Sequence, residues 1–281
     1  MLSIIVPTYK EDEIIGDFIE TLESDNFIKN INHEVIIVDD SVDEKTSDRA
    51  VEAFHKIKFY DYNISAHMGK TGKGQAIYRG IKEAKGNIIC VIDADLEYHP
   101  KYIKNLYKTL INLELDIVVS VRKRKDAKYR KMLSKIYKLI VQLLLGLNFD
   151  TQSGLKIFKK ETLKNFAPII PGWSWDVDFL LNAKEKKYKT GFVSVPFTSR
   201  KKGESKISVK SSIPMFKDLL TLKFKESLKL KCEHLTRKSI IKKSIKNKRL
   251  KFKNKKLERS KLGKKKFDRV VNKSAKGKKR R

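Results

Sequence analysis

Patterns typical of strands and of amphipathic helices alternate along residues 1–125, and this alternation restricts the fold more than any other feature. Short runs, most of them apolar and rich in β-branched residues, predict strands at 2–9, 34–41, 58–64, 87–95 and 116–122. Apolar residues at helical spacing predict helices at 11–24, 47–57, 73–86 (closed by Gly86) and 100–113. This order predicts an α/β fold with a mainly parallel sheet flanked by helices.

The rest of the chain is expected to complete the globular domain and to add a basic segment after it. A long amphipathic helix is expected at 128–149, and 153–163 and 191–206 are expected to return to the sheet as strands or loops. We therefore place the globular domain at 1–207, an amphipathic segment at 208–235 and a tail rich in lysine and arginine at 236–281. The tail holds too few large apolar side chains for a core, so we expect it to be disordered.

The net charge of +31 is concentrated near the C-terminus, where Thr221–Arg281 holds 27 Lys and Arg against four Asp and Glu. The apolar stretch 139–147 is far shorter than the ~20 residues that a spanning helix needs, and no signal peptide is expected. The two cysteines, Cys90 and Cys232, have no metal-site spacing and indicate a reducing, cytosolic setting.

Acidic residues follow two of the predicted strands, where parallel sheets bind their ligands. Asp39 stands at the end of one strand, where a carboxylate can accept from a ribose hydroxyl or a base N–H. The apolar strand at 87–95 runs into Asp93, Asp95 and Glu97, and isolated carboxylates are costly to bury. Such a cluster suits Mg²⁺ or Mn²⁺, which would bridge a diphosphate and stabilise it as a leaving group. A solvated acidic loop is the alternative.

Three further segments carry chemistry that the residues alone leave open. Glycines in 69–76 allow a ligand to approach a helix start, where Lys73 adds positive charge, although a flexible loop would explain them equally. Asp176 and Asp178 follow Trp175 and could contact sugar hydroxyls, or Asp176 could cap a helix. The basic loop 199–206 suits phosphate oxygens, and a solvated loop is again the alternative.

Taken together, several of these stretches resemble the family 2 glycosyltransferases of the GT-A fold. The stretches are LSIIVPTYKE, VIIVDDSVD, GKGQA, DADLEYHP, DTQSGLKIF and SRKKGESK, in this order. Within that family the sequence is most similar to the branch of dolichyl-phosphate mannose synthase and polyprenyl-phosphate glycosyltransferases. The resemblance covers residues 2–207 and implies the nucleotide-diphospho-sugar transferase (GT-A) fold.

The resemblance also implies roles for individual residues. The nucleotide-sugar site would comprise Pro7, Tyr9, Glu11, Asp39, Lys73, Asp93 and Asp95. The metal would be held by Asp93, Asp95 and Glu97, where the family usually has Gln in place of Glu97. The acceptor phosphate would meet Arg122 or Arg124, together with Arg130 and Ser134. Catalysis would rest on Asp95, Arg200 and Lys206, the latter two closing over the diphosphates.

The reaction so implied is an inverting, Mg²⁺- or Mn²⁺-dependent transfer, with GDP-mannose the first candidate donor and UDP-glucose the second. The acceptor would be dolichyl or polyprenyl phosphate, which places the enzyme peripherally on the cytoplasmic face of an anionic membrane. A membrane-anchoring subunit is compatible with this arrangement. The alternatives are a saccharide acceptor, for which Asp176 or Asp178 would serve as base, and a nucleic-acid-binding protein acting through the tail. A nucleic-acid-binding function would not explain the acidic residues at 93–97. Binding of the tail to nucleic acid would be non-specific.

Overall fold

The structure is a computed structural model that describes residues 1–66, 69, 71–124, 128–148, 153–164, 166, 168, 170, 172, 174–198 and 214–225, with 123–124, 128–131 and 133–134 described for the backbone alone. Residues Met1–Lys223 form a first compact unit, and the last two described residues, 224 and 225, fall outside it. The expected boundary at 207/208 and the basic tail from residue 236 lie outside the described residues.

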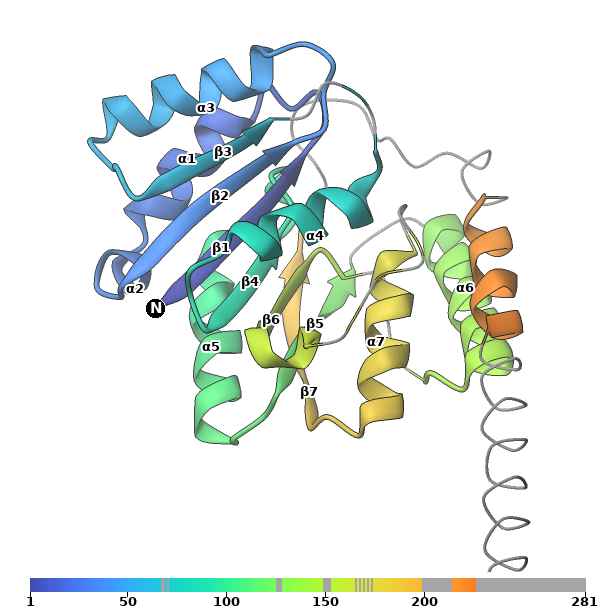
Figure 1. Ribbon diagram of the computed structural model, residues 1–281. Coiled ribbons are helices and arrows are strands. Elements are labelled where there is room, and N and C mark those ends of the chain that lie inside the picture. The colour runs from blue at the N-terminus through green and yellow to red at the C-terminus, as the bar shows by residue number, and fades with distance from the viewer. Residues whose placement is uncertain are drawn as a thin grey trace, which may run out of the picture. The chain divides into compact units, whose positions relative to one another are not determined.

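The described part of the first unit is built on one seven-stranded sheet (Figure 1). Its strands are β1 (Leu2–Thr8), β2 (His33–Asp39), β3 (Tyr62–Ala66), β4 (Ile88–Ile92), β5 (Ile117–Arg124), β6 (Leu155–Lys159) and β7 (Thr190–Phe197), in the order β3-β2-β1-β4-β6-β5-β7. Only β6 runs antiparallel to its neighbours among these strands. The predicted α/β fold with a mainly parallel sheet is confirmed.

Helices cover both faces of the sheet, so each face has its own apolar core. They are α1 (Ile15–Ser24), α2 (Asn26–Lys29), α3 (Lys45–Lys56), α4 (Lys73–Glu83), α5 (Ile103–Asn112), α6 (Lys128–Leu145) and α7 (Trp175–Lys186), with the 3-10 turns η1 (Pro100–Tyr102) and η2 (Lys160–Leu163) and a further helix at 214–225. Phe18, Phe54 and Leu106 of α1, α3 and α5 fill one core. Ile77 of α4 and Phe179 of α7 fill the other. The strands are therefore apolar on both sides, which explains their continuous apolar sequences.

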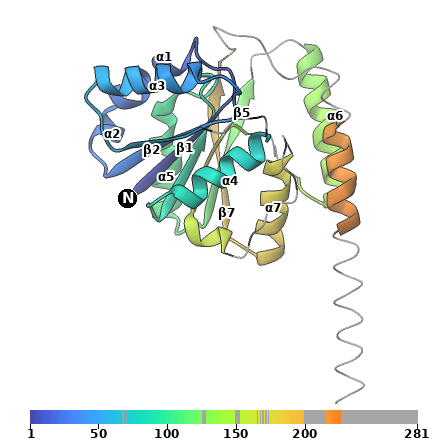
Figure 2. The same ribbon diagram turned by 45° about the horizontal axis from the view of Figure 1, so that its top comes forward.

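The amphipathic segments after residue 127 extend the second core. Val141 and Leu145 of α6 are buried in it, together with Leu219 and Leu222 from residues 214–223. Figures 1 and 2 show α6 beside this helix. Gly146, whose φ is +64°, follows the last residue of α6, so the helix ends four residues before the predicted end at residue 149.

The strand ends differ most from the predicted ones at β3 and β4. β3 begins at Tyr62 rather than at residue 58, because Lys58 takes a φ of +56° and the chain turns there. β4 ends at Ile92, so Asp93, Asp95 and Glu97 lie in a turn and not on the strand. Leu96 has a φ of +56° within this turn. The three carboxylates therefore do not point to one side as alternate residues of a strand would.

Gly86 does not close α4 as expected. The helix ends at Glu83, and Gly86 instead packs against β1, where its N–H donates to Ser3 Oγ at 2.8 Å. A Cβ on Gly86 would come within 2.6 Å of the same oxygen, so this close approach requires glycine.

Candidate functional site

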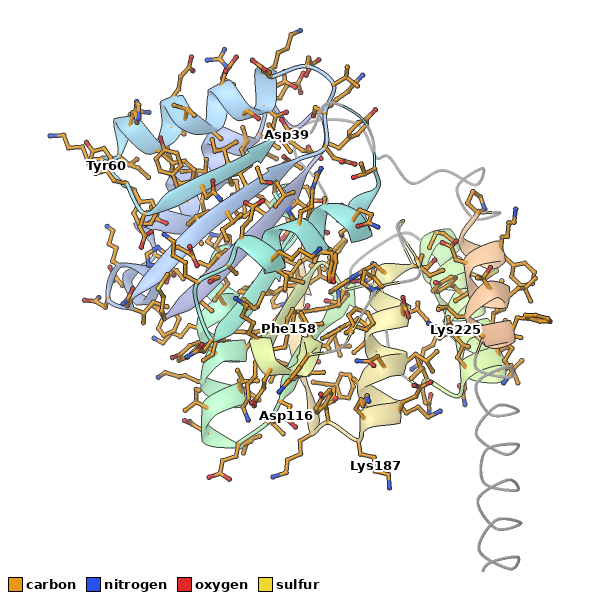
Figure 3. All side chains as sticks on the ribbon, viewed as in Figure 1. Asp39, Tyr60, Asp116, Phe158, Lys187 and Lys225 are labelled. Carbon is orange, nitrogen blue, oxygen red and sulfur yellow. The ribbon has the colours of Figure 1, made fainter. Side chains whose placement is uncertain are left out.

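The carboxyl ends of β2, β1 and β4 are adjacent, and they bring the predicted donor-site residues to one edge of the sheet. Thr8 at the end of β1 pairs in register with Asp39 at the end of β2, and β4 borders β1 on its other side. Pro7, Tyr9 and Glu11 therefore share this edge with Asp39 and with the turn that follows β4. Figure 3 shows Asp39 at this edge, far from Asp116, which precedes β5 at the opposite edge. The roles of Pro7, Tyr9, Glu11 and Asp39 in binding a nucleotide sugar stay predictions.

Asp39 is buried and holds three chain segments together. Its carboxylate accepts from Ser41 Oγ at 2.6 Å, from Ser47 Oγ in α3 at 2.9 Å and from Thr8 Oγ1 in β1 at 3.4 Å. This network fixes the end of β1 against the start of α3. It also fixes the carboxylate itself, as precise recognition of a nucleotide would require.

The loop after β1 is fixed by hydroxyl groups of the same region. The Lys10 N–H donates to Ser41 Oγ at 2.7 Å, and the Glu11 N–H donates to Thr46 Oγ1 at 3.1 Å. Lys10 has a φ of +53°, a left-handed conformation that these bonds stabilise. The backbone on both sides of Lys10, including Tyr9, is thereby held at the edge of the sheet.

Asp40 is a site residue that the sequence analysis did not assign. It is buried, and its carboxylate accepts from the N–H groups of Thr71 and Gly72 at 2.8 and 2.7 Å and from Thr71 Oγ1 at 2.6 Å. Arg79 of α4 adds an ion pair at 3.2 Å. Asp40 therefore pins the glycine-containing loop to the end of β2. The adjacent pair of acids at 39–40 was the available signal.

Lys73, the first residue of α4, faces the acidic turn. Its Nζ lies 2.7 Å from Asp93 Oδ1 and 2.8 Å from Oδ2. Burial lowers the pKa of Lys73, but the carboxylates of Asp93, Asp176 and Asp95 outweigh this and raise it well above its usual value. Lys73 is thus a fixed cation at the start of a helix, which suits binding of a diphosphate.

The expected group of three metal-ligating carboxylates is not assembled. Within the described residues, no three His, Cys, Asp or Glu side chains form a group that could hold a metal ion. The turn after β4 separates the acids, and Lys73 is bound to Asp93. The donor set still fits Mg²⁺ or Mn²⁺, since such ions are commonly held by one or two carboxylates together with substrate phosphates. Asp95 with one further acid of this turn would provide such carboxylates, and their role as metal ligands stays a prediction.

A second ion pair, which is buried and was also missed from the sequence, joins Lys156 and Asp176. Lys156 of β6 is 1% exposed, and its Nζ lies 2.9 Å from Asp176 Oδ1 of α7 and donates to the carbonyl oxygen of Ser153. Burial lowers the pKa of Lys156 and raises that of Asp176, in each case against the effect of the partner's charge. Asp176 does not cap α7, because the N-cap residue is Ser174. Asp178 is also buried and accepts from the Ile170 N–H at 3.4 Å.

The residues expected around the acceptor phosphate are only partly described. Arg122 lies on β5, with its Cζ 5.8 Å from the ring centroid of Phe197 on β7. The side chains of Arg124, Arg130 and Ser134 lie outside the described residues, as do Arg200 and Lys206 altogether. The Thr198 N–H donates to the Glu97 carbonyl oxygen at 3.1 Å, so the chain leaves β7 beside the acidic turn just before residues 199–206.

Comparison with known proteins identifies the family of this chain. The sequence profile of the family described as Glycosyl transferase family 2 matches residues 3–170. A dolichol-phosphate mannosyltransferase of Pyrococcus furiosus is 30% identical over 75% of this chain and 60% of its own length. A dolichyl-phosphate beta-glucosyltransferase of Dictyostelium discoideum is 28% identical over 80% of this chain and 74% of its own. The chain thus spans less than two thirds of the Pyrococcus relative.

Solved structures support the fold assignment. Glucosyl-3-phosphoglycerate synthase from Mycobacterium tuberculosis, in complex with phosphoglyceric acid, superposes with a TM-score of 0.59 at 19% identity over 73% of each chain. The same enzyme in complex with Mn²⁺, UDP-glucose and glycerol 3-phosphate gives a TM-score of 0.57 at 18% identity, again over 73% of each chain. The predicted GT-A fold is confirmed.

Proposed function

Because the chain belongs to glycosyl transferase family 2, we propose that it transfers a sugar from a nucleotide-sugar donor to the phosphate group of a dolichyl or polyprenyl lipid. The names of the Pyrococcus and Dictyostelium relatives support a lipid phosphate as acceptor. They differ in the sugar, so mannose from GDP-mannose is the first candidate and glucose from UDP-glucose the second.

The observation that carries this proposal is the pairing of Asp176 with Lys156. A hydroxyl acceptor needs a general base within hydrogen-bond reach of its proton. The two candidate bases, Asp176 and Asp178, are buried, and both already accept hydrogen bonds from groups of the protein. A phosphate acceptor is anionic at neutral pH and requires no such base, which favours it over a saccharide.

The reaction follows from the charges at the edge of the sheet. A phosphate oxygen of the lipid attacks the anomeric carbon, and the bond from that carbon to the donor diphosphate breaks on the opposite side. The nucleoside diphosphate leaves with the electron pair, and the anomeric configuration inverts. Lys73 is placed to stabilise the developing negative charge, with Arg200 and Lys206 proposed to assist. A bound Mg²⁺ or Mn²⁺ at Asp95 and a neighbouring acid would supply Lewis-acid stabilisation.

An exposed apolar stripe on α6 supports a peripheral position on the membrane that holds the acceptor. Met132, Ile136, Leu139 and Leu143 lie on one side of the helix and are 47–75% exposed. Lys135 and Lys138 between them are also exposed. Apolar and basic side chains on one helix suit the interface of an anionic bilayer. None of the helices in the described part of the chain combines the length and apolarity needed to cross a bilayer.

The test is transfer of radioactivity into lipid. Purified full-length protein is incubated with dolichyl phosphate, Mn²⁺ or Mg²⁺, and labelled GDP-mannose or UDP-glucose, and the organic phase is counted. We expect label from one donor, its loss with EDTA and with Asp95→Asn, and its retention with Asp43→Asn, which alters an exposed acid after β2. Folded protein with dispersed lipid that labels neither organic phase would contradict a lipid-phosphate acceptor.

A further inference from the structure

Four charged side chains of alternating sign extend from the donor edge into the protein, and of these the proposed reaction names only Lys73. The Lys73–Asp93 pair lies at the edge, where both side chains are partly exposed. The Lys156–Asp176 pair lies deeper, with both side chains almost completely buried. The two pairs interact electrostatically, because the carboxylate of Asp176 favours the charged form of Lys73 and the carboxylate of Asp93 favours the charged form of Lys156.

Two of the four residues stand where helices begin, and both helices lie on the same face of the sheet. Lys73 is the first residue of α4, and Asp176 is the second residue of α7. Both helices cover the face of the sheet to which Phe158 contributes, and Lys156 lies on that face two residues before it (Figure 1). Lys156 thus lies beneath the two helix starts.

A short stretch of backbone joins the deep pair to Asp93. Lys156 donates to the carbonyl oxygen of Ser153, and the Asp93 N–H donates to the carbonyl oxygen of the next residue, Gly154, at 3.2 Å. Gly154 also packs against the Asp93 carboxylate, because a Cβ there would come within 2.4 Å of Oδ2. A shift of Lys156 would therefore move the backbone against which Asp93 rests.

Stability alone is a poor explanation for this arrangement. Moving two charges into the interior is costly, and replacing a buried ion pair by apolar side chains is often neutral or stabilising. A lysine in the middle of a sheet, between apolar neighbours, therefore indicates a role beyond holding the fold.

We propose that Lys156 and Asp176 are positioning residues for the transfer reaction, which hold Asp93, and through it Lys73, so that the Lys73 ammonium group meets the donor diphosphate. Asp176 neutralises Lys156 and so keeps its ammonium group from drawing Asp93 inward. Without that partner, Asp93 is the next carboxylate that acts on Lys156. This inference rests on the proposed function for the identity of the ligand and adds two residues to its machinery.

The decisive variant removes both charges together, because a single substitution would leave one buried charge without a partner. We compare Lys156→Met/Asp176→Leu, and as a polar alternative Lys156→Gln/Asp176→Asn, with the full-length wild type. Lys159→Met is the matched control, since Lys159 lies on the same strand and pairs with Asp116 at the same 2.9 Å, but at the opposite edge of the sheet. Thermal unfolding establishes that each protein is folded.

The first measurement is calorimetric binding of GDP and of UDP in the presence of Mn²⁺, which requires no acceptor. We expect the dissociation constant of the nucleotide to rise about tenfold in either double variant, as for residues that orient metal and phosphate ligands, and to stay unchanged in Lys159→Met. The second is transfer to dolichyl phosphate, where kcat should fall about 100-fold with little change in the KM of the acceptor.

The outcomes separate this inference from the proposed function. A folded double variant with wild-type nucleotide binding and wild-type kcat would show that the pair is structural only. Weakened nucleotide binding in the double variants, with no transfer to lipid by the wild type, would keep the positioning role and reject the acceptor.

Discussion

The carboxylate of Asp40 accepts a hydrogen bond from the backbone N–H of Gly72 at 2.7 Å, across 32 positions of sequence. This bond, with those from Thr71, holds the loop before α4 against the end of β2. Because α4 begins at Lys73, the position of the Lys73 ammonium depends on this anchor. We therefore expect donor binding to be coupled to Asp40, an acid that need not contact the donor.

Replacing Asp40 by asparagine tests this anchor. An amide NH₂ facing the N–H groups of Thr71 and Gly72 would repel them, and Arg79 would lose its counter-charge. We expect the free energy of unfolding to fall by about 2 kcal/mol and the dissociation constant of the nucleotide to rise several-fold. Chemical denaturation and calorimetry measure the two effects, with exposed Asp43→Asn as control. Equal nucleotide binding by Asp40→Asn and Asp43→Asn would refute the coupling.

Gly154→Ala should impair the site more than it impairs the fold. The new Cβ would lie 2.4 Å from Asp93 Oδ2, so the carboxylate must move away from its present position. We expect kcat for transfer to fall at least about tenfold, because small misplacements of reacting groups are costly. Gly16→Ala in α1 meets no atom within 4 Å and serves as control, with unchanged kcat and a gain of about 0.5–1 kcal/mol in stability. Unaltered kcat in Gly154→Ala would show that Asp93 tolerates displacement.

The buried pair of His33 and Glu23 predicts a pH-dependent contribution to stability. Burial lowers the pKa of His33, but its hydrogen bonds to Glu23 at 3.1 Å and to the Ile31 carbonyl oxygen, together with the charges of Glu23 and Asp61, outweigh this, and the net pKa is raised. The protonated form is therefore favoured in the folded state. Its stabilisation is complete below the unfolded pKa of about 6.5 and is lost as pH rises through the higher folded value.

Thermal unfolding of wild type and Glu23→Gln between pH 5.5 and 8.5 measures this contribution. The difference in Tm should be largest at pH 5.5 and should shrink toward pH 8.5. Glu20→Gln, which removes the exposed ion pair with Lys56, provides the control and should show a small difference at every pH. A Tm difference for Glu23→Gln that grows with pH would contradict a raised pKa of His33 in the folded state.

Charges placed on the α6 stripe should weaken membrane binding without unfolding the protein. Leu139 and Leu143 are 54% and 75% exposed, so Leu139→Glu/Leu143→Glu removes little packing. We expect less protein to sediment with vesicles containing anionic lipid, and less transfer to vesicle-borne dolichyl phosphate, at an unchanged Tm. Leu113→Glu, at a 63% exposed position after α5, is the matched control. Vesicle binding that responds to both substitutions alike, or to neither, would exclude this stripe as the contact surface.

The regular parts of the fold were predictable because the information is local. An apolar strand and an amphipathic helix are each visible within about ten residues of sequence, and their alternation implies a parallel sheet. Because the carboxyl ends of parallel strands lie at one edge of the sheet, this alternation also predicted Asp39 and Asp93 at the same edge. Backbone turns at Lys58 and Leu96 escaped prediction because a positive φ in a non-glycine residue has only a weak sequence signal.

The family, the sheet and the edge to which the acids belong could therefore be predicted from the sequence. The contacts of those acids could not, because they depend on how distant segments pack. Lys73 and Asp93 are 20 positions apart, and Lys156 meets Asp176 only because β6 inserts antiparallel beneath the start of α7. A charge in a sequence has no partner until distant segments pack, and burial then makes the choice of partner energetically decisive.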